Sequence, residues 1–401
     1  MKIIHTSDWH LGQNFFGFDR RPDHEHMIGE LTDLIISEKP DALIVAGDIY
    51  DTQTPGAAVQ KMFVENMVAL HKAHPAMTIV CISGNHDSAS RHEIHQAPWS
   101  ALNVYMMGKI DSENLQANII EVQDKGWIVA VPYTNERFLD DSFYGKLQDA
   151  VNEKTDGIKP VIYVGHAAMK DCEFTGHDIL NDRFIGGIEC TDIEDIGDAY
   201  DYIALGHIHK AQTFRNGRAR YCGSPLPVSF DEVRSGYEHG FTIVETASHG
   251  AIPSIRTKNI ECTHPLVNIP AEGHAGWREV IEELKAFPSE IPAYIRLNVM
   301  LKDDQTLPYD KENQIMEALQ GKQGRYALLN PTREQTARTA GQTGAVRISS
   351  VEELLNSNPL TVMQSYAQMK EFAFTDSYVE MFNEIIESLN RTEDEDQETG
   401  N

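Results

Sequence analysis

Short apolar segments recur through the first half of the chain, and each has the length and composition of a buried strand. Apolar residues at helical spacing precede the second segment, at residues 27–37, and follow it, at residues 55–74. Strands that alternate with helices in this way predict an α/β sandwich. The five predicted strands are residues 2–5, 42–45, 77–82, 160–164 and 202–205.

A second and smaller α/β pattern follows a stretch rich in Pro, Gly and His at residues 271–276. We expect a large domain over residues 1–272, a small α/β capping domain over residues 273–345 and a C-terminal helical segment over residues 346–401. The elements predicted for the small domain are helices at residues 277–287 and 309–319 and strands at residues 293–300 and 325–329.

The last part of the chain has a mixed character. Residues 339–345 are rich in Gly, Thr and Gln and predict a loop. Ser350 and Glu353 form a capping-box pattern that opens a short predicted helix, and residues 361–389 follow an amphipathic helical pattern. The tail after Asn390 holds one arginine and five acids, so we expect it to be disordered.

Polar residues that bind metals follow each of the five predicted strands. Ligands of α/β proteins bind at the carboxyl ends of the strands, so five such ends can converge on one point. Mixed nitrogen and oxygen donors suit Mn²⁺, Fe²⁺ or Zn²⁺, and seven ligands suit two ions if one carboxylate bridges them. The seven candidate ligands are Asp8, His10, Asp48, Asn85, His166, His207 and His209.

Composition narrows the class of protein. The chain of 401 residues carries 34 Lys and Arg against 61 Asp and Glu, a net charge of −27, which argues against nucleic-acid binding through global basicity. Its 41% hydrophobic content is sufficient for a sizeable core. The five cysteines include no Cys-x-x-Cys pair, and neither a signal peptide nor a membrane span is recognised, so we expect a cytoplasmic protein with no membrane contact.

The strand-end motifs resemble those of the calcineurin-like binuclear metallophosphoesterases. Inside that family, the chain looks like its DNA-nuclease branch, most clearly over residues 220–232, which lie outside the predicted metal shell. The resemblance implies a four-layer αββα sandwich with a small α/β capping domain and C-terminal helices. The motifs that carry the family resemblance are residues 8–10, 47–48, 84–87, 165–166 and 206–209, and those of the branch are residues 5–15, 45–52, 202–209 and 220–232.

Carried over to this sequence, the resemblance implies two Mn²⁺ ions, with Mg²⁺ or another divalent ion as the alternative. The first would be held by Asp8, His10, Asp48 and His209, and the second by Asp48, Asn85, His166 and His207. His177 is a weaker alternative to His166, because it lies in a polar loop.

Three further positions bear on the predicted chemistry. His86 would face the scissile phosphate and protonate the leaving oxygen. Asp87 would orient His86, or else act only as a turn residue. Asp51 stands where archaeal relatives have a second histidine, which puts a second catalytic imidazole in doubt.

The resemblance further implies a manganese-dependent DNA nuclease, acting as a 3′–5′ exonuclease on duplex ends and as an endonuclease on hairpins and single strands. An SMC-like ABC ATPase would be its partner in a heterotetramer, since this chain has no Walker loop of its own. Residues 55–74 and a following helix near residues 91–102 would form a homodimer interface, and residues 361–389 would dock on the ATPase. DNA phosphates would be contacted by Lys210, Arg215, Arg218 and Arg220, unless these form only a solvated basic hairpin.

Two other functions are compatible with parts of this pattern. A protein phosphatase or nucleotidase would use the same metals, although about 120 residues after the large domain count against it. A non-catalytic scaffold subunit is the other alternative, and the intact set of seven ligands argues against it.

Overall fold

The computed structural model describes most of the first 333 residues. The described positions are 1–94, 96–134, 139, 142–170, 172–173, 191–234, 236–302, 305–333, 360, 363–364 and 378–379. By its internal contacts the chain divides into residues 1–333 and residues 334–401. The loop, helix, docking segment and tail predicted beyond residue 333 fall almost wholly outside the described residues.

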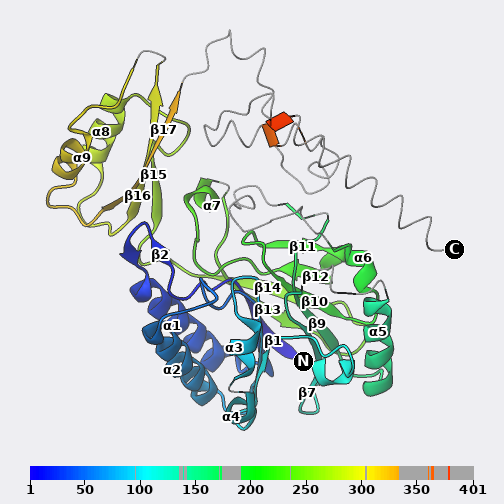
Figure 1. Cartoon of the computed structure of the whole chain (residues 1–401). Coiled ribbons are helices and arrows are strands. Elements are labelled where there is room, and N and C mark those ends of the chain that lie inside the picture. The colour runs from blue at the N-terminus through cyan, green and yellow to red at the C-terminus, as the bar shows by residue number, and fades with distance from the viewer. Residues whose placement is uncertain are drawn as a thin grey trace. The chain divides into compact units, whose positions relative to one another are not determined.

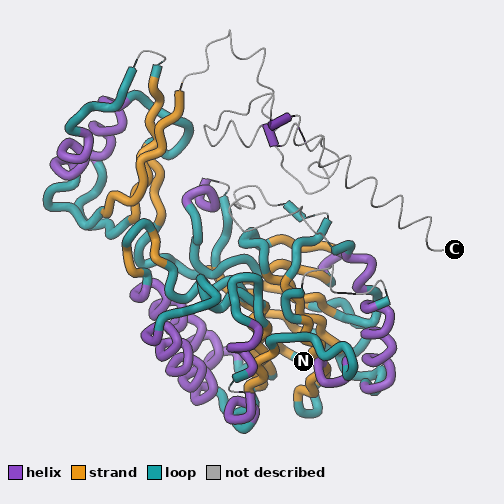
Figure 2. Tube along the Cα trace, in the orientation of Figure 1, coloured by secondary structure: helices purple, strands orange, loops and turns teal. Residues whose placement is uncertain are grey.

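Two six-stranded sheets form the centre of residues 1–333 (Figure 2). In the first sheet four neighbouring strands run parallel, and two antiparallel strands extend it at one edge. Its order is β14 (Ser254–Asn259), β13 (Gly240–Glu245), β1 (Lys2–Thr6), β4 (Ala42–Ala46), β5 (Thr78–Ile82) and β6 (Val104–Met107).

The second sheet also has four parallel strands, with one antiparallel strand at each edge. Its order is β11 (Gln212–Phe214), β12 (Ala219–Tyr221), β10 (Tyr202–Gly206), β9 (Val161–His166), β8 (Gly126–Val131) and β7 (Ile119–Val122).

The two sheets pack face to face, and helices cover their outer faces. Strand β4 shows how one sequence serves two cores, because successive side chains of a strand point to opposite faces. Ile44 and its even-numbered neighbours pack in the core between the sheets. Leu43 and Val45 pack on the other face, in the core that also contains side chains of α1 (Arg21–Glu38) and α2 (Ala57–Ala73).

Figure 1 shows α5 (Phe143–Lys154) and α6 (Ile193–Ile196) on the outer side of the second sheet, opposite α1 and α2. Helix, sheet, sheet and helix therefore follow one another, which confirms the predicted α/β sandwich. No helix in the described part of the chain is long and apolar enough to cross a membrane.

Some predicted elements differ from the observed ones. The helix expected near residues 91–102 is two short helices, α3 (Ala89–Glu93) and α4 (Gln96–Ser100). Pro98 has no backbone N–H to donate to a longer helical ladder. Strand β14 was not predicted, because five of its six residues are exposed polar side chains, which leave no apolar segment in the sequence.

A third sheet has a core of its own, and it combines two strands of the region predicted as the capping domain with one strand, at residues 266–269, from the end of the predicted large domain. Its three parallel strands run in the order β15 (Leu266–Ile269), β16 (Tyr294–Leu301) and β17 (Arg325–Arg333). Helices α8 (Trp277–Ala286) and α9 (Lys311–Ala318) pack with it. The domain boundaries at residues 272 and 345 stay predictions.

Candidate metal centre

All seven predicted ligands lie where parallel strands end. Asp8 and His10 follow β1, Asp48 follows β4, and Asn85 follows β5 in the first sheet. In the second sheet His166 ends β9, and His207 and His209 follow β10. Because the two sheets pack face to face, the ends of five strands meet at one edge of the sandwich.

Six of the seven form two buried clusters of groups able to bind metals. One cluster contains Asp8, His10 and His209, with the Nε2 atoms of the two histidines 3.3 Å apart. The other contains Asp48, His166 and His207. Within each cluster the ligand atoms lie within 4.8 Å of one another, so each can surround one ion.

Asp48 and Asn85 complete the arrangement. The Asp48 Oδ2 atom lies 3.3 Å from His166 Nε2 and 4.0 Å from His10 Nε2, so one carboxylate reaches both clusters. The Asn85 Oδ1 atom lies 3.0 Å from His166 Nε2 and 3.1 Å from His207 Nδ1. One carboxylate thus lies near histidines of both clusters, and the amide oxygen lies near two histidines of the second cluster.

Four of these residues have a backbone conformation that side chains with a Cβ atom rarely adopt. The φ angles of Asp8, His10, Asp48 and His207 are +53°, +46°, +50° and +96°. Such conformations cost about 1–3 kcal/mol each and persist where the surrounding structure requires them, typically at functional sites. Because four such residues occur at these strand ends, we infer that the rest of the fold stabilises the strained conformations that direct the ligand side chains inward.

Glycine residues allow the strands to approach closely at the same place. A Cβ atom on Gly84 would lie 2.1 Å from Asp48 Oδ1, and one on Gly206 would lie 1.9 Å from the Ala46 carbonyl oxygen. Any side chain there would displace the bridging carboxylate or separate β4 from β10. Together with the donor set, this close approach shows that the residues fit two divalent ions.

Burial and mutual charge shift the titration of the ligands. Burial disfavours the ionised carboxylate of Asp48, but the neighbouring His166 outweighs it and lowers the pKa of Asp48. Burial also acts against protonated His166, yet Asp48 raises the pKa of His166 to about 9. Asp8 differs, because burial raises the pKa of its carboxyl group. A bound cation would replace these protons as the counter-charge.

His86 lies beside the clusters, with its ring centroid 4.9 Å from that of His10. Its Nδ1 atom donates to the main-chain carbonyl of Asp51 at 3.0 Å. Burial acts against protonated His10, but the Asp51 carboxylate, 3.5 Å from His10 Nδ1, outweighs it and raises the pKa of His10. Asp51 therefore supports two histidines of the site, one by its backbone and one by its side chain.

Asp87 holds the loops that carry the ligands. Its Oδ2 atom accepts from the backbone amides of Ile49 at 3.1 Å and Gly84 at 2.9 Å, and its Oδ1 atom accepts from that of Tyr50 at 2.9 Å. These contacts are those of a turn residue, the alternative to its role as the group that orients His86. The catalytic role of Asp87 stays a prediction.

The four predicted DNA-contacting residues are engaged with neighbours. Lys210 pairs with Glu173, and Arg215 pairs with the exposed Glu194 and Asp198. Arg220 differs in that its guanidinium donates to threonine hydroxyls at 2.8–3.2 Å, which leaves its charge uncompensated by those contacts. Arg218 donates to the Gly250 carbonyl at 3.0 Å and lies 4.0 Å from the buried carboxylate of Asp201.

Sequence reasoning missed Glu232, a residue in direct contact with a predicted ligand. Its Oε1 atom lies 2.8 Å from His209 Nδ1, and burial raises the pKa of Glu232 to about 8. It stands 23 positions after His209, so no local spacing pointed to it. The available signal was its place at the end of residues 220–232, the segment that resembled the nuclease branch.

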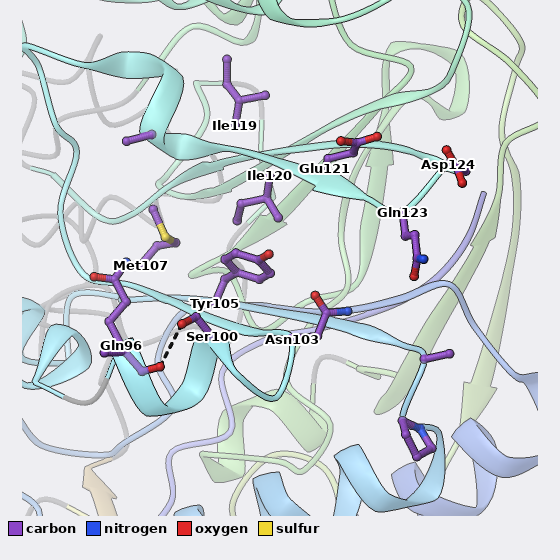
Figure 3. A pocket seen from close by; sticks show the side chains of 14 residues that line it. Gln96, Ser100, Asn103, Tyr105, Met107, Ile119, Ile120, Glu121, Gln123 and Asp124 are labelled. Carbon is purple, nitrogen blue, oxygen red and sulfur yellow. Dashed lines mark hydrogen bonds between the residues drawn. The ribbon is translucent and has the colours of Figure 1, made fainter.

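A cavity of about 910 Å³ lies away from these residues, between the edge strands β6 and β7 (Figure 3). Tyr105 and Met107 of β6 and Ile120 and Glu121 of β7 are among the side chains that line it. None of the predicted ligands or catalytic residues lines this cavity, so the candidate site rests on the strand-end clusters.

Comparison with known families agrees with the site geometry. The model of the family described as "Calcineurin-like phosphoesterase" matches residues 1–211, which is more than half of the chain. The chain is a calcineurin-like phosphoesterase. The matched range includes all seven predicted ligands of this phosphoesterase together with His86.

Several curated proteins similar to the phosphoesterase are named as the D subunit of the nuclease SbcCD. The protein from Escherichia coli is 28% identical over 383 residues, which cover 89% of this chain and 92% of the relative. The one from Rhodobacter capsulatus is 29% identical over 311 residues, covering 71% and 75%. The one from Bacillus subtilis is 31% identical over 271 residues, covering 61% and 66%. These similarities confirm the predicted nuclease branch.

Proposed function

We propose that this chain is the nuclease subunit of an SbcCD-type complex and hydrolyses phosphodiester bonds of DNA at a binuclear metal centre. The observation that carries the proposal is the pair of buried clusters that Asp48 joins at the strand ends. Imidazoles together with carboxylates suit Mn²⁺, Fe²⁺ or Zn²⁺, and we propose Mn²⁺ among them from the resemblance to the nuclease branch. Two such ions supply a nucleophile near neutral pH and neutralise charge on the phosphate.

The protein residues contribute ligand placement and proton transfer. Asp8, His10 and His209 would hold one ion, Asn85, His166 and His207 would hold the other, and Asp48 would be shared. The Asp51 carbonyl accepts the Nδ1 proton of His86 and so makes Nε2 the nitrogen that passes a proton to the leaving 3′ oxygen. Asp87 keeps the loops after β4 and β5 in register with this imidazole.

The partners belong to the proposal too. The curated relatives are named as subunits of SbcCD, so we propose an SbcC-type ATPase as partner in a heterotetramer, with processing of DNA breaks and hairpins during recombination and replication as the role. The face of α2 beside its buried Phe63 and Met67 is the proposed homodimer contact. The described cysteines are free, which supports a cytoplasmic location.

The test is cleavage of linear duplex and hairpin DNA with Mn²⁺, with and without the ATPase and ATP. We expect His86→Ala to bind the metal as wild type does and to cleave about 10²–10⁴-fold more slowly, the usual contribution of a general acid. His26→Ala, in α1, is the matched control, because its imidazole contacts the Glu261 carbonyl, at 3.2 Å, outside the predicted site; this variant should cleave at the wild-type rate. Cleavage that His86→Ala leaves unchanged contradicts the mechanism. Hydrolysis of a phosphomonoester without cleavage of DNA would instead favour a phosphatase.

A further inference from the structure

The segment that distinguishes the nuclease branch, residues 220–232, encloses one metal ligand from two sides. The backbone amide of Ser224 donates to the carbonyl oxygen of His209 at 3.2 Å. Gly223, with φ +76°, passes so close that a Cβ atom there would lie 2.6 Å from that carbonyl oxygen. Glu232, at the other end of the segment, contacts the imidazole of His209. The segment therefore holds both the main chain and the side chain of His209.

The contact with Glu232 determines which ring nitrogen of His209 faces the metal centre. At 2.8 Å from Glu232 Oε1, the Nδ1 atom is turned toward the carboxyl group, so Nε2 is the ring nitrogen left to face the metal centre. That Nε2 atom is the one that lies 3.3 Å from His10 Nε2, inside the first cluster. Carboxylates placed behind ligating imidazoles orient the ring and raise its basicity as a ligand.

Glu232 is itself fixed in place. Its side chain is 1% exposed, and its Oε2 atom accepts from the backbone amide of Val228 at 2.9 Å. One oxygen of Glu232 contacts His209 and the other accepts from Val228, and these two contacts together fix the orientation of the carboxyl group. Phe230, two residues earlier in α7 (Phe230–Arg234), is buried against Phe15.

The loop that holds Glu232 is in turn held by residues that follow β1. Gln13 donates to the Val228 carbonyl at 3.2 Å, and the Nη1 atom of Arg20 donates to the Pro227 carbonyl at 2.6 Å. Arg20 also donates to Gln13 Oε1 at 2.8 Å and is 1% exposed. The backbone amide of Gln13 donates to the His10 carbonyl at 3.0 Å, so one hydrogen-bonded network connects His10 with His209, which follow strands of different sheets.

We propose that Glu232 is a positioning residue for the metal centre, which holds the His209 imidazole with Nε2 toward the first ion. The inference rests on the proposed function only in so far as the centre binds metal. It also gives a physical reason for residues 220–232, which the metal ligands themselves leave unexplained.

The test is Mn²⁺ binding to the full-length, metal-free protein. The affinity for each ion is measured by calorimetry, and the number of bound ions per chain is measured after dialysis. We expect Glu232→Ala to bind one ion about 10–100-fold more weakly than wild type and the other ion unchanged, with a smaller loss for Glu232→Gln. Asp231→Asn is the matched control, because Asp231 precedes Glu232 in the same helix and pairs with Arg296 instead. It should bind both ions as wild type does.

Each outcome separates positioning from a purely structural role. A loss that is larger for Glu232→Ala than for Glu232→Gln supports the inference, since the amide oxygen of glutamine can still accept from His209 Nδ1. Wild-type affinity for both ions in both variants overturns it. So does an equal loss of both ions together with a lower melting temperature of the metal-free protein. Wild-type protein that binds two ions but leaves DNA intact contradicts the proposed function and leaves this inference standing.

Discussion

Replacing Asp87 by asparagine separates the two roles that remain open for this carboxylate. The side chain is fully buried and accepts three backbone hydrogen bonds, two at Oδ2 and one at Oδ1. Asparagine has the same shape but only one oxygen, and its amide group donates. If Asp87 holds the loops, the change costs stability, whereas a group that only orients His86 would leave stability unchanged.

The magnitude follows from the number of donors. In the best orientation the asparagine oxygen takes the place of Oδ2 and keeps Ile49 and Gly84, which turns its amide group toward the Tyr50 N–H. One bond to a charged acceptor is lost, at about 1.5–3 kcal/mol, and the two that remain fall to about 1 kcal/mol each. We therefore expect the free energy of unfolding to fall by about 2.5–7 kcal/mol, which is roughly 70-fold or more in the unfolding equilibrium.

The assay is urea denaturation of the metal-free protein, followed by tryptophan fluorescence. Asp111→Asn is a matched control, because Asp111 accepts from two backbone amides in an exposed turn, at 3.1 and 3.2 Å. It should lose less than about 1 kcal/mol. An Asp87→Asn variant within about 0.5 kcal/mol of wild type that still lost cleavage would refute the reasoning and assign Asp87 to His86.

Two further predictions concern pH and salt. Burial lowers the pKa of His24 from 6.5 to about 3, so the folded protein keeps this imidazole neutral while the unfolded chain takes up a proton below pH 6.5. The stability that this group contributes is present above pH 6.5 and is lost as the pH falls toward 3. The free energy of unfolding, measured by urea denaturation, should therefore fall less between pH 7 and pH 5 for His24→Gln than for wild type. The difference should be up to about 1.4 kcal/mol per pH unit below 6.5. DNA binding by the isolated chain should be weak at about 200 mM salt. Arg220→Ala should reduce the slope of the logarithm of the binding constant against the logarithm of the salt concentration by about one. An unchanged slope in a filter-binding titration would show that Arg220 does not contact DNA.

The sequence predicted the strands that carry the site, because buried parallel strands leave continuous apolar segments. Residues 42–45 and 202–205 match β4 and β10 to within one residue. Strand β14 was missed because it is an edge strand with polar side chains, and the buried strands β8 and β13 were missed as well, although their residues are mostly apolar. The predicted helix near residues 91–102 was wrong for a local reason, the interruption that produces α3 and α4.

Candidate ligands were found from residue type and position alone, because few kinds of side chain bind metal ions and because ligand sites of α/β proteins lie at the ends of strands. Their partners were not found in this way. Glu232 supports His209 from 23 residues away, and Asp87 binds the backbone near Ile49, 38 residues earlier. Arg215, which looked free of acidic neighbours in the sequence, is paired with Glu194 and Asp198 by the fold.

What the sequence by itself determined was a set of ligands, an alternation of strands and helices, and the family that has both. Only the tertiary structure decided how the five strand ends meet, which carboxylate reaches both clusters and which ring nitrogen of His209 points inward. The reason is physical. Burial and strand periodicity are local properties that a sequence records, whereas hydrogen-bond partners, left-handed ligand conformations and close glycine contacts arise when two sheets pack face to face.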